Sequence, residues 1–190
     1  MNNKTDDEII NNIRAGNIAA YAMLLDKYKN MVFTLAFNIL LNKEDAEELA
    51  QDVFVKAFKA LELFKGKSLF STWLYRIVIN TALNKKKLKK IRLIVSEEEL
   101  IDDVYNDLNN LLKQQERNDS KKFIQSAMRS LKDDERLCIT LFYLNELSLD
   151  EIHELTGLSI ANIKVLLHRG RKNLYRQLSI LLRSEMNHLI

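Results

Sequence analysis

Apolar side chains in the N-terminal half of the chain recur at the spacing of α-helices. Within residues 49–61 they occur every four positions, which places them on one face of a helix. Gly66 interrupts this pattern, and a strongly apolar stretch with helical spacing resumes at residues 70–83. N-terminal capping patterns precede such segments at residues 5–8, which read Thr-Asp-Asp-Glu, and at Asn42, which is followed by acidic residues. The pattern predicts a bundle of successive helices.

A second pattern, in residues 148–174, has the spacing of two helices joined by a tight turn. Residues 148–151 form a capping box that starts the first helix, Gly157 supplies the left-handed residue that ends it, and Ser159 caps the second helix. The residues that would face inward on the second helix are Ile163, Leu167, Gly170 and Leu174. The residues that would face outward, none of them acidic, are Lys164, Val165, His168, Arg169 and Lys172. This arrangement is typical of a helix-turn-helix motif, whose second helix enters the major groove of DNA, although an ordinary helical hairpin has the same spacing.

Between the two patterns, residues 91–118 show weak periodicity and a high content of acids and asparagine. We therefore predict an all-α protein of two helical domains, residues 1–90 and 119–190, joined by an acidic linker over 91–118. Composition supports this fold class, because the 190 residues include no proline and only four glycines. Few residues are then available to break helices or form tight β-turns, so an all-β sandwich is not expected.

The formal net charge of +3 conceals blocks of opposite sign. Residues 76–92 contain seven bases and no acid, and residues 160–183 contain six bases and no acid. The acidic segment over 96–119 separates these two blocks. Two separate contacts with a polyanion, joined by a segment that avoids it, would explain the pattern. Solvated helix faces are the alternative explanation.

Cysteine content and hydropathy limit the class of protein further. Cys138 is the single cysteine, so an intramolecular disulfide and a cysteine-rich zinc site are excluded. The most apolar stretch, residues 31–41, is shorter than the roughly 20 residues that span a bilayer. The N-terminus lacks the pattern of a secretory signal. We expect a cytoplasmic protein with no membrane insertion, no bound metal and no cofactor.

Residues 64–76 combine aromatic rings, lysines and small hydroxyl residues around Gly66, directly before the first basic block. Such a mixture suits unpaired nucleic acid, because lysines follow phosphates, rings support an unstacked base, and amides contact base edges. Candidate contact residues in this region are Lys67, Ser68, Phe70, Trp73, Arg76, Asn80, Asn84, Lys85 and Lys87. Alternatively, Phe70 and Trp73 belong to the core.

Three motifs in this order resemble those of bacterial RNA polymerase sigma factors, sigma-70 family, of the extracytoplasmic-function (ECF) subfamily. Residues 45–54 are similar to the family's core-polymerase-binding helix, residues 71–80 to its promoter-melting segment, and residues 147–174 to its C-terminal helix-turn-helix. The resemblance extends over about residues 6–182 and is weak only across the linker. It implies a transcription initiation factor, and not an enzyme, that binds core RNA polymerase and promoter DNA.

The resemblance also assigns expected roles to residues. Contact with the polymerase clamp would involve Glu48, Gln51, Asp52, Phe54 and Phe58. The nine candidates between Lys67 and Lys87 would recognise and open the minus-ten element. The minus-thirty-five element would be read by Lys164, Val165, His168 and Arg169, with Arg171 and Lys172 on phosphates. The second domain would dock on the polymerase flap, the linker would thread the RNA channel, and an anti-sigma factor would restrain the protein.

The chain departs from the family pattern inside the helix-turn-helix. Asn162, Val165 and Leu166 stand where relatives often carry Thr, Ser and a basic residue, which leaves the bases that are read open. Gly170 replaces a usual Ala, so we expect a locally weaker helix, since glycine is about 1 kcal/mol worse than alanine in a helix interior. His153 replaces a usual small residue, so we expect a more open angle between the two helices.

Two other classes of protein remain as alternatives. An autonomous regulator would bind a DNA palindrome as a dimer and sense a ligand through its first domain. A metal-dependent nuclease would use Glu44, Asp45, Glu48 and Asp52, which helical spacing brings to one side of a helix. No general base or nucleophile accompanies these acids in the sequence, so a partner-binding face is the better interpretation.

Overall fold

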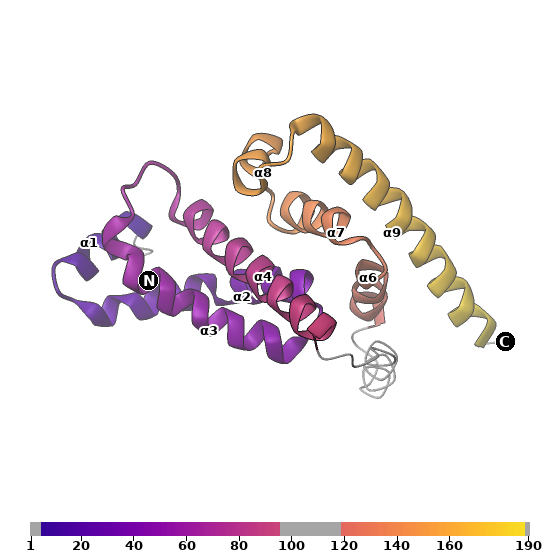
Figure 1. Ribbon diagram of the computed structural model, residues 1–190, viewed down its shortest axis with the longest axis horizontal. Helices are drawn as coiled ribbons and strands as arrows, with labels where there is room; N and C mark the ends of the chain where they lie inside the picture. Colours follow the sequence, from indigo (N-terminus) through magenta and orange to yellow (C-terminus); the bar gives the residue numbers. More distant parts are fainter. Residues whose placement is uncertain (1–4, 96–118, 189–190) are drawn as a thin grey trace.

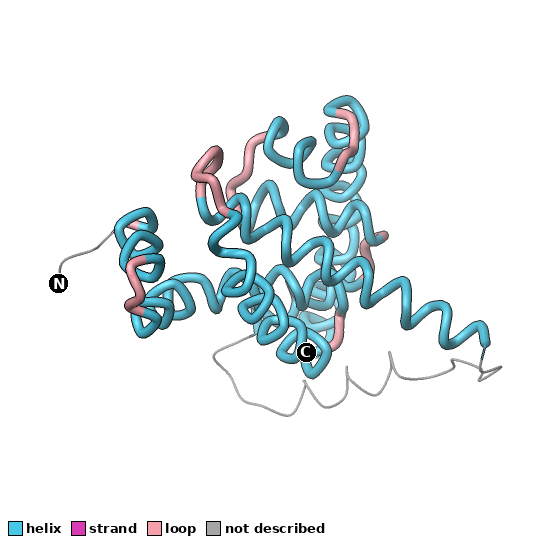
Figure 2. The backbone as a smooth tube through the Cα atoms, turned by 60° about the vertical axis from the view of Figure 1, so that its left-hand side comes forward, coloured by secondary structure: helices cyan, strands magenta, loops and turns pink. Residues whose placement is uncertain are grey.

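The computed structural model describes residues 5–95 and 119–188, and within these ranges it contains helices joined by short loops and no strand (Figures 1 and 2). The first domain consists of α1 (Asp6–Arg14), η1 (Ile18–Ala20), α2 (Tyr21–Leu40), α3 (Lys43–Ala60), η2 (Leu61–Leu63) and α4 (Phe70–Val95). The second consists of α6 (Asp119–Arg129), α7 (Asp133–Ile139), η3 (Thr140–Leu144), α8 (Leu149–Thr156) and α9 (Ile160–His188). The predicted all-α, two-domain fold is confirmed. Of the predicted linker, residues 91–95 continue α4, and residues 96–118 lie outside the described residues.

The helix ends lie where the capping patterns place them. The Thr5 hydroxyl accepts from the backbone N–H of Glu8, whose carboxylate accepts in turn from the backbone N–H of Thr5. Asn42 caps α3, and Ser148 starts α8 with a second capping box. Gly157 ends α8 with φ of 73°, a left-handed conformation that suits glycine. These local rules therefore hold.

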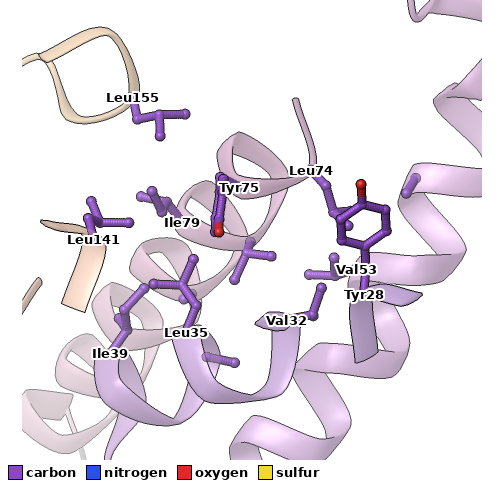
Figure 3. Close-up of a cluster of buried hydrophobic side chains, with 14 of the residues drawn as sticks. Tyr28, Val32, Leu35, Ile39, Val53, Leu74, Tyr75, Ile79, Leu141 and Leu155 are labelled. Carbon is purple, nitrogen blue, oxygen red and sulfur yellow. The ribbon is translucent and has the colours of Figure 1, made fainter. Parts of the chain in front are cut away.

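Helix α2 forms the centre of the first domain and packs against both α3 and α4. The apolar stripe predicted within residues 49–61 is buried, with Leu49 and Val53 fully inaccessible to solvent. Val53 faces Val32 of α2 and Leu74 of α4 in the same core (Figure 3). Because burying a leucine or valine contributes about 1.5–3 kcal/mol, this stripe fixes the position of α3.

Helix α9 runs along the second domain and contacts α6, α7 and α8 (Figure 1). Gly170 is buried in α9 at its contact with α7, and a Cβ built there would lie 2.8 Å from Cγ1 of Ile139. The helix is continuous through this glycine. The expected weakening of α9 is therefore not visible as a break. Instead, the missing Cβ allows the two helices to approach each other closely.

His153 does not separate the two helices of the helix-turn-helix. Its side chain is exposed, and Nδ1 lies 2.7 Å from the carbonyl oxygen of Leu158 in the turn. The reason for expecting an open angle, a bulky side chain between the helices, is therefore wrong.

Between α7 and α8 the chain forms a π-helical segment, η3, that the sequence does not predict. The backbone N–H of Asn145 donates to the carbonyl oxygen of Thr140 at 3.1 Å, five residues earlier. Wider π turns occur mostly as single turns and often at functional sites. Leu141 lies within this segment and is fully buried.

The two domains pack against each other in one continuous core. Leu141 and Leu155 of the second domain lie beside Tyr75, Ile79 and Ile39 of the first (Figure 3). Contacts join α2 to α7 and η3, and α4 to α8. The sequence predicts two separate modules, and their mutual packing is a finding of the structure.

Candidate functional site

A groove of about 690 Å³ lies between α2 and α3 on the surface of the first domain. Gln51, Phe54 and Phe58, all predicted to bind polymerase, line it. Phe54 is largely buried in the floor, where its carbonyl oxygen accepts a 2.7 Å hydrogen bond from the Tyr21 hydroxyl. Phe58 forms the exposed wall, with its ring 5.0 Å from that of Tyr21. The groove is therefore a formed, mostly apolar surface that can accept a partner.

Helix α2 supplies half of this groove, and the sequence interpretation missed it. Leu25 and Phe33 line the groove from α2, and Val55 lines it from α3 with 53% of its surface exposed. An apolar residue such as Val55, two positions away from the stripe residues Val53 and Ala57, is the signal that could have revealed the groove.

Glu48 and Asp52 do not line the groove. Glu48 lies on the side of α3 that faces α4, where its carboxylate is 2.6 Å from the Lys85 ammonium. Asp45 shares this cluster, at 3.0 Å from Lys85 and 3.2 Å from Lys89. The predicted polymerase-binding residues therefore divide between two faces of α3.

The cluster on α3 and α4 shifts the pKa of both partners. Partial burial alone would raise the pKa of Asp45, but the ammonium groups of Lys85 and Lys89 outweigh it and hold that pKa below its usual value. Burial alone would lower the pKa of Lys85, and the carboxylates of Glu48 and Asp45 outweigh it and raise that pKa. Lysine ammonium groups therefore pair with Asp45 and Glu48, two of the four carboxylates that a nuclease would use for metal binding.

An aromatic cluster underlies the loop that precedes α4. Phe70 is buried, with its ring centroid 5.7 Å from that of Phe64 and 5.5 Å from those of Trp73 and Tyr28. Phe70 is therefore a core residue that positions the loop, as the alternative reading allowed. Trp73 is partly exposed, with one side on this cluster.

A second hollow, of about 550 Å³, is lined by the loop residues Lys67 and Ser68 and by the start of α1. Asp6 and Asp7 contribute carboxylates to it, and the sequence interpretation did not include them. Asp6 is paired with Lys27 at 2.6 Å. The Lys27 ammonium therefore neutralises the negative charge that Asp6 would otherwise bring to the wall of this hollow.

The remaining candidates on α4 form an exposed row. Arg76, Asn80, Asn84 and Lys87 are all exposed, which leaves their polar groups available to a ligand. Lys85 is partly buried by its ion pairs. Most of the predicted nucleic-acid candidates of α4 are therefore three or four residues apart and share one accessible face of this helix.

The helix-turn-helix presents its predicted outward residues to solvent. Lys164, Val165, His168 and Arg169 are exposed on α9, behind which Ile163 is fully buried. Ser159 caps α9 by accepting from the backbone N–H of residue 162 at 3.3 Å.

Beyond this reading face, two more bases are exposed on α9. Arg171 and Lys172 are both accessible, and Arg171 donates to the Tyr143 hydroxyl at 3.2 Å. That contact orients the guanidinium beside the recognition face. A basic face without acids on a helix of this position is the arrangement that reads a major groove.

This fold and these surfaces define a two-domain transcription factor of the sigma-70 type. Residues 24–90 match the family model for Sigma-70 region 2, and residues 124–174 match that for Sigma-70, region 4. The ECF RNA polymerase sigma factor SigW of Bacillus subtilis (strain 168) is 30% identical over 186 residues, which cover 89% of this chain and 94% of that protein. The ECF RNA polymerase sigma-E factor of Escherichia coli (strain K12) is 27% identical, over 94% of this chain and 97% of that one.

The chain therefore belongs to the extracytoplasmic-function group of sigma-70 factors, proteins that direct transcription initiation and are not enzymes. Its fold is similar to that of the sigma factor RpoE in complex with the anti-sigma factor NepR from Bartonella quintana. The TM-score is 0.72, with 20% identity over 84% of this chain and 97% of that one. Within residues 5–95 and 119–188, no helix has the length and apolarity to cross a membrane.

Proposed function

We propose that this chain binds core RNA polymerase and directs it to promoters. It would do so by contacting the minus-ten and minus-thirty-five elements and by helping to separate the two DNA strands. The observation that carries the proposal is the separation of surfaces on the first domain. An apolar groove lies between α2 and α3, and an exposed polar and basic row lies on α4. A protein that bound only DNA would have no use for the groove.

In this proposal the domains divide the work. Residues 1–90 bind polymerase and the minus-ten element, residues 91–118 link the domains, and residues 119–190 read the minus-thirty-five element. The match of region 2 over 24–90 and of region 4 over 124–174 supports this division.

The polymerase clamp would occupy the α2–α3 groove. Gln51 and Phe58 would contact it directly, and buried Phe54 would shape the floor. Glu48 and Asp52 would lie at the edge of this interface, where exposed carboxylates add to association rate more than to affinity.

Promoter opening would take place on the loop and on α4. Lys67 and Ser68 line the polar hollow that would hold an unstacked base, and partly exposed Trp73 would support the edge of the unpaired strand. On α4, the side-chain amides of Asn80 and Asn84 would contact the edges of nucleobases. The positively charged side chains would contact phosphates; these are Arg76, Lys85 and Lys87.

The second domain would read the minus-thirty-five element with α9. Lys164, His168 and Arg169 offer donors to base edges or phosphates, and Val165 offers an apolar contact to a thymine methyl group. Arg171 and Lys172 would hold the phosphate backbone, which sets the register of the helix.

An anti-sigma factor is the expected regulatory partner. The sigma factor RpoE is found in complex with the anti-sigma factor NepR, and the structure of CnrH is a complex with the cytosolic domain of CnrY. Both have the fold of this chain, with TM-scores of 0.72 and 0.61.

Run-off transcription with core polymerase tests the proposal. The wild-type chain should direct transcripts from particular genomic fragments. Phe58→Ala, which removes the exposed wall of the groove, should weaken association with core polymerase by about tenfold. Glu44→Gln, an exposed position of α3 outside the groove, should have no such effect.

Two results would count against the proposal. Equal amounts of transcript with and without the added chain would show that the chain does not direct initiation. The Phe58→Ala and wild-type proteins could also bind core polymerase with equal affinity while melting curves show that both are folded. That result would mean that the groove is not part of the polymerase interface.

A further inference from the structure

The loop of residues 65–69 connects η2 to α4 and carries two of the proposed minus-ten residues. All five of its residues are exposed. In the part of the chain that the structure describes, residues 65–68 take part in no hydrogen bond. The residues on either side of the loop, Phe64 and Phe70, are buried. The position of the 65–69 loop is therefore determined at its two ends.

Arg14, in the last turn of α1, contacts the first of these ends. Its Nη2 donates to the carbonyl oxygen of Leu61 at 3.0 Å and to the carbonyl oxygen of Phe64. Leu61 is the C-cap of α3, and Phe64 is the C-cap of η2. Carbonyls at such positions lack an intrahelical partner, and the helix dipole favours a cation there. Arg14 therefore caps these two elements from a separate helix.

The ring of Phe64 is held in place by the aromatic cluster. Its centroid lies 5.7 Å from that of Phe70 and 5.3 Å from that of Trp73. The backbone of Phe64 is extended, and Gly66 then turns the chain with φ of 66°, a left-handed conformation that suits glycine. The residues proposed to contact DNA follow this turn directly. A shift of the Phe64 carbonyl would therefore change the path of the whole loop.

The other end of α1 contacts the other end of the loop through Tyr28. The Asp6 carboxylate accepts from the Tyr28 hydroxyl at 2.5 Å, and the Tyr28 ring lies 5.5 Å from that of Phe70, the first residue of α4. Three buried isoleucines between Asp6 and Arg14 fix α1 to the core. The nine residues of α1, about 12 Å long, thus determine where the loop begins and ends.

Helix α1 also lines the hollow that would hold an unstacked nucleobase. The start of α1 contributes to this hollow together with Lys67 and Ser68, at the same end of the first domain (Figure 1). The family model for region 2 matches residues 24–90, so α1 precedes the matched segment. The contacts of α1 are therefore the observation that connects it with reading of the promoter.

We propose that Arg14 is a positioning residue for the minus-ten element, because it fixes the direction in which the 65–69 loop leaves the core. The proposal rests on the proposed function. Arg14 acts through the carbonyl oxygens of Leu61 and Phe64 and does not itself contact DNA. Discrimination between nucleobases needs donors and acceptors held at hydrogen-bond distance, so a loop whose start is not fixed would accept disfavoured nucleobases more readily.

Arg14→Met is the test substitution. Methionine keeps an unbranched apolar stem and a similar helix propensity but removes the charge and both donated hydrogen bonds. Because Arg14 is exposed, the change opens no cavity in the core. Lys43→Ala is the matched control, since it removes an exposed cation of the same domain whose ammonium lies 3.8 Å from the Glu47 carboxylate. Melting curves show whether each variant is folded, and Arg14→Gln replaces Arg14→Met if that variant does not fold.

The fluorescence of Trp73, the single tryptophan of the chain, tests the positioning in the free full-length protein. Trp73 packs on Phe64, so Arg14→Met should shift its emission to longer wavelength and increase its quenching by acrylamide. The control variant should match the wild-type protein. Emission and quenching equal to those of the wild-type protein in Arg14→Met would overturn the proposal.

Nucleobase preference in transcription tests the consequence for promoters. A promoter that the wild-type chain directs is randomised at the minus-ten element in one library and at the minus-thirty-five element in another. The run-off products formed with core polymerase are then sequenced. Arg14→Met should reduce the preference for the favoured nucleobase by about fivefold at one or more minus-ten positions and leave the minus-thirty-five preferences unchanged.

Arg14→Lys should restore most of the lost preference. Both hydrogen bonds come from one nitrogen of Arg14, and the lysine ammonium also offers several donors from one nitrogen.

A merely structural role of Arg14 would give a different result. Total transcript would fall while the preferences in both libraries stayed as in the wild-type protein, and this would overturn the proposal. Equal loss of preference at both elements would overturn it as well. A wild-type chain that directs no transcripts would remove the proposed function and with it the minus-ten role of Arg14, whereas the Trp73 measurement would still decide whether Arg14 fixes the loop.

Discussion

Gly170→Ala is a substitution for which helix propensity and packing predict opposite effects on stability. Propensity alone predicts that alanine stabilises the interior of α9 by about 1 kcal/mol. Packing opposes this, because the new Cβ would lie 2.8 Å from Cγ1 and 3.2 Å from Cδ1 of Ile139. Cγ1 is close to the backbone of a side chain that is only 3% exposed, so it cannot simply swing away.

The magnitudes favour packing. Adding a methyl group to a filled core costs about 1–3 kcal/mol, which exceeds the gain in propensity. We expect Gly170→Ala to lower the free energy of unfolding by about 1 kcal/mol, which corresponds to a fall in Tm of about 2–4 °C for a chain of this length.

A double-mutant cycle separates the two contributions. Ile139→Ala removes both atoms that the new Cβ would meet, and leaves Cβ of Glu135 at 3.5 Å, an ordinary contact, as the nearest neighbour. In that background Gly170→Ala should become stabilising, since only the gain in propensity remains. The coupling energy from urea unfolding of the four proteins, followed by circular dichroism, should be about 1–3 kcal/mol.

A stabilising effect of Gly170→Ala in both backgrounds would refute this reasoning. So would a coupling energy within about 0.5 kcal/mol of zero, the usual error of additivity. Either result would mean that α7 and α9 have room for a side chain at their crossing.

Other substitutions test the separate surfaces. Lys87→Ala should weaken promoter complexes to a similar extent on different sequences and reduce the salt slope by about 1, and a promoter-selective loss would contradict a phosphate contact. Trp73→Ala should reduce strand opening, measured by permanganate footprinting, and should leave formation of the closed complex unchanged. Unchanged strand opening would mean that Trp73 only packs in the aromatic cluster. Tyr21→Phe removes the hydroxyl bonded to the Phe54 carbonyl and should lower the unfolding free energy by about 1 kcal/mol, with an unchanged urea midpoint as the contrary result. Burial raises the pKa of the Cys138 thiol to about 11, so at pH 8 the folded protein should react with Ellman's reagent at least about a hundredfold more slowly than the unfolded one, and equal rates would contradict its burial.

Features that depend on neighbouring residues could be predicted from the sequence. The caps at Thr5, Asn42 and Ser148 and the helix end at Gly157 each need only a few adjacent residues, and all four are present. The outward face of α9 follows from helical periodicity in the same way. Sequence separation is small in every case.

Features that depend on contacts between distant segments could not be predicted. The hydrogen bond from Arg136 to Asn38 joins residues 98 positions apart, and no local pattern marks a buried arginine. The groove needs α2 beside α3, so Phe33 was missed although Phe58 was found. Phe70 was placed correctly near the loop, but an aromatic ring beside lysines has the same sequence signature whether it lies on the surface or in the core.

The π turn at Thr140–Leu144 has a consequence for how this protein can vary. Such a turn accommodates one residue more than an α-helix does, so loss of a single codon there would restore the α-helical register. Residues on either side of the lost position would then keep nearly their present orientation about the helix axis, because the wide turn alone accommodates the extra residue. The same deletion inside the regular helix α8 would instead rotate the following residues by about 100°. The segment Thr140–Leu144 should therefore tolerate a change of length by one residue better than the regular helices beside it.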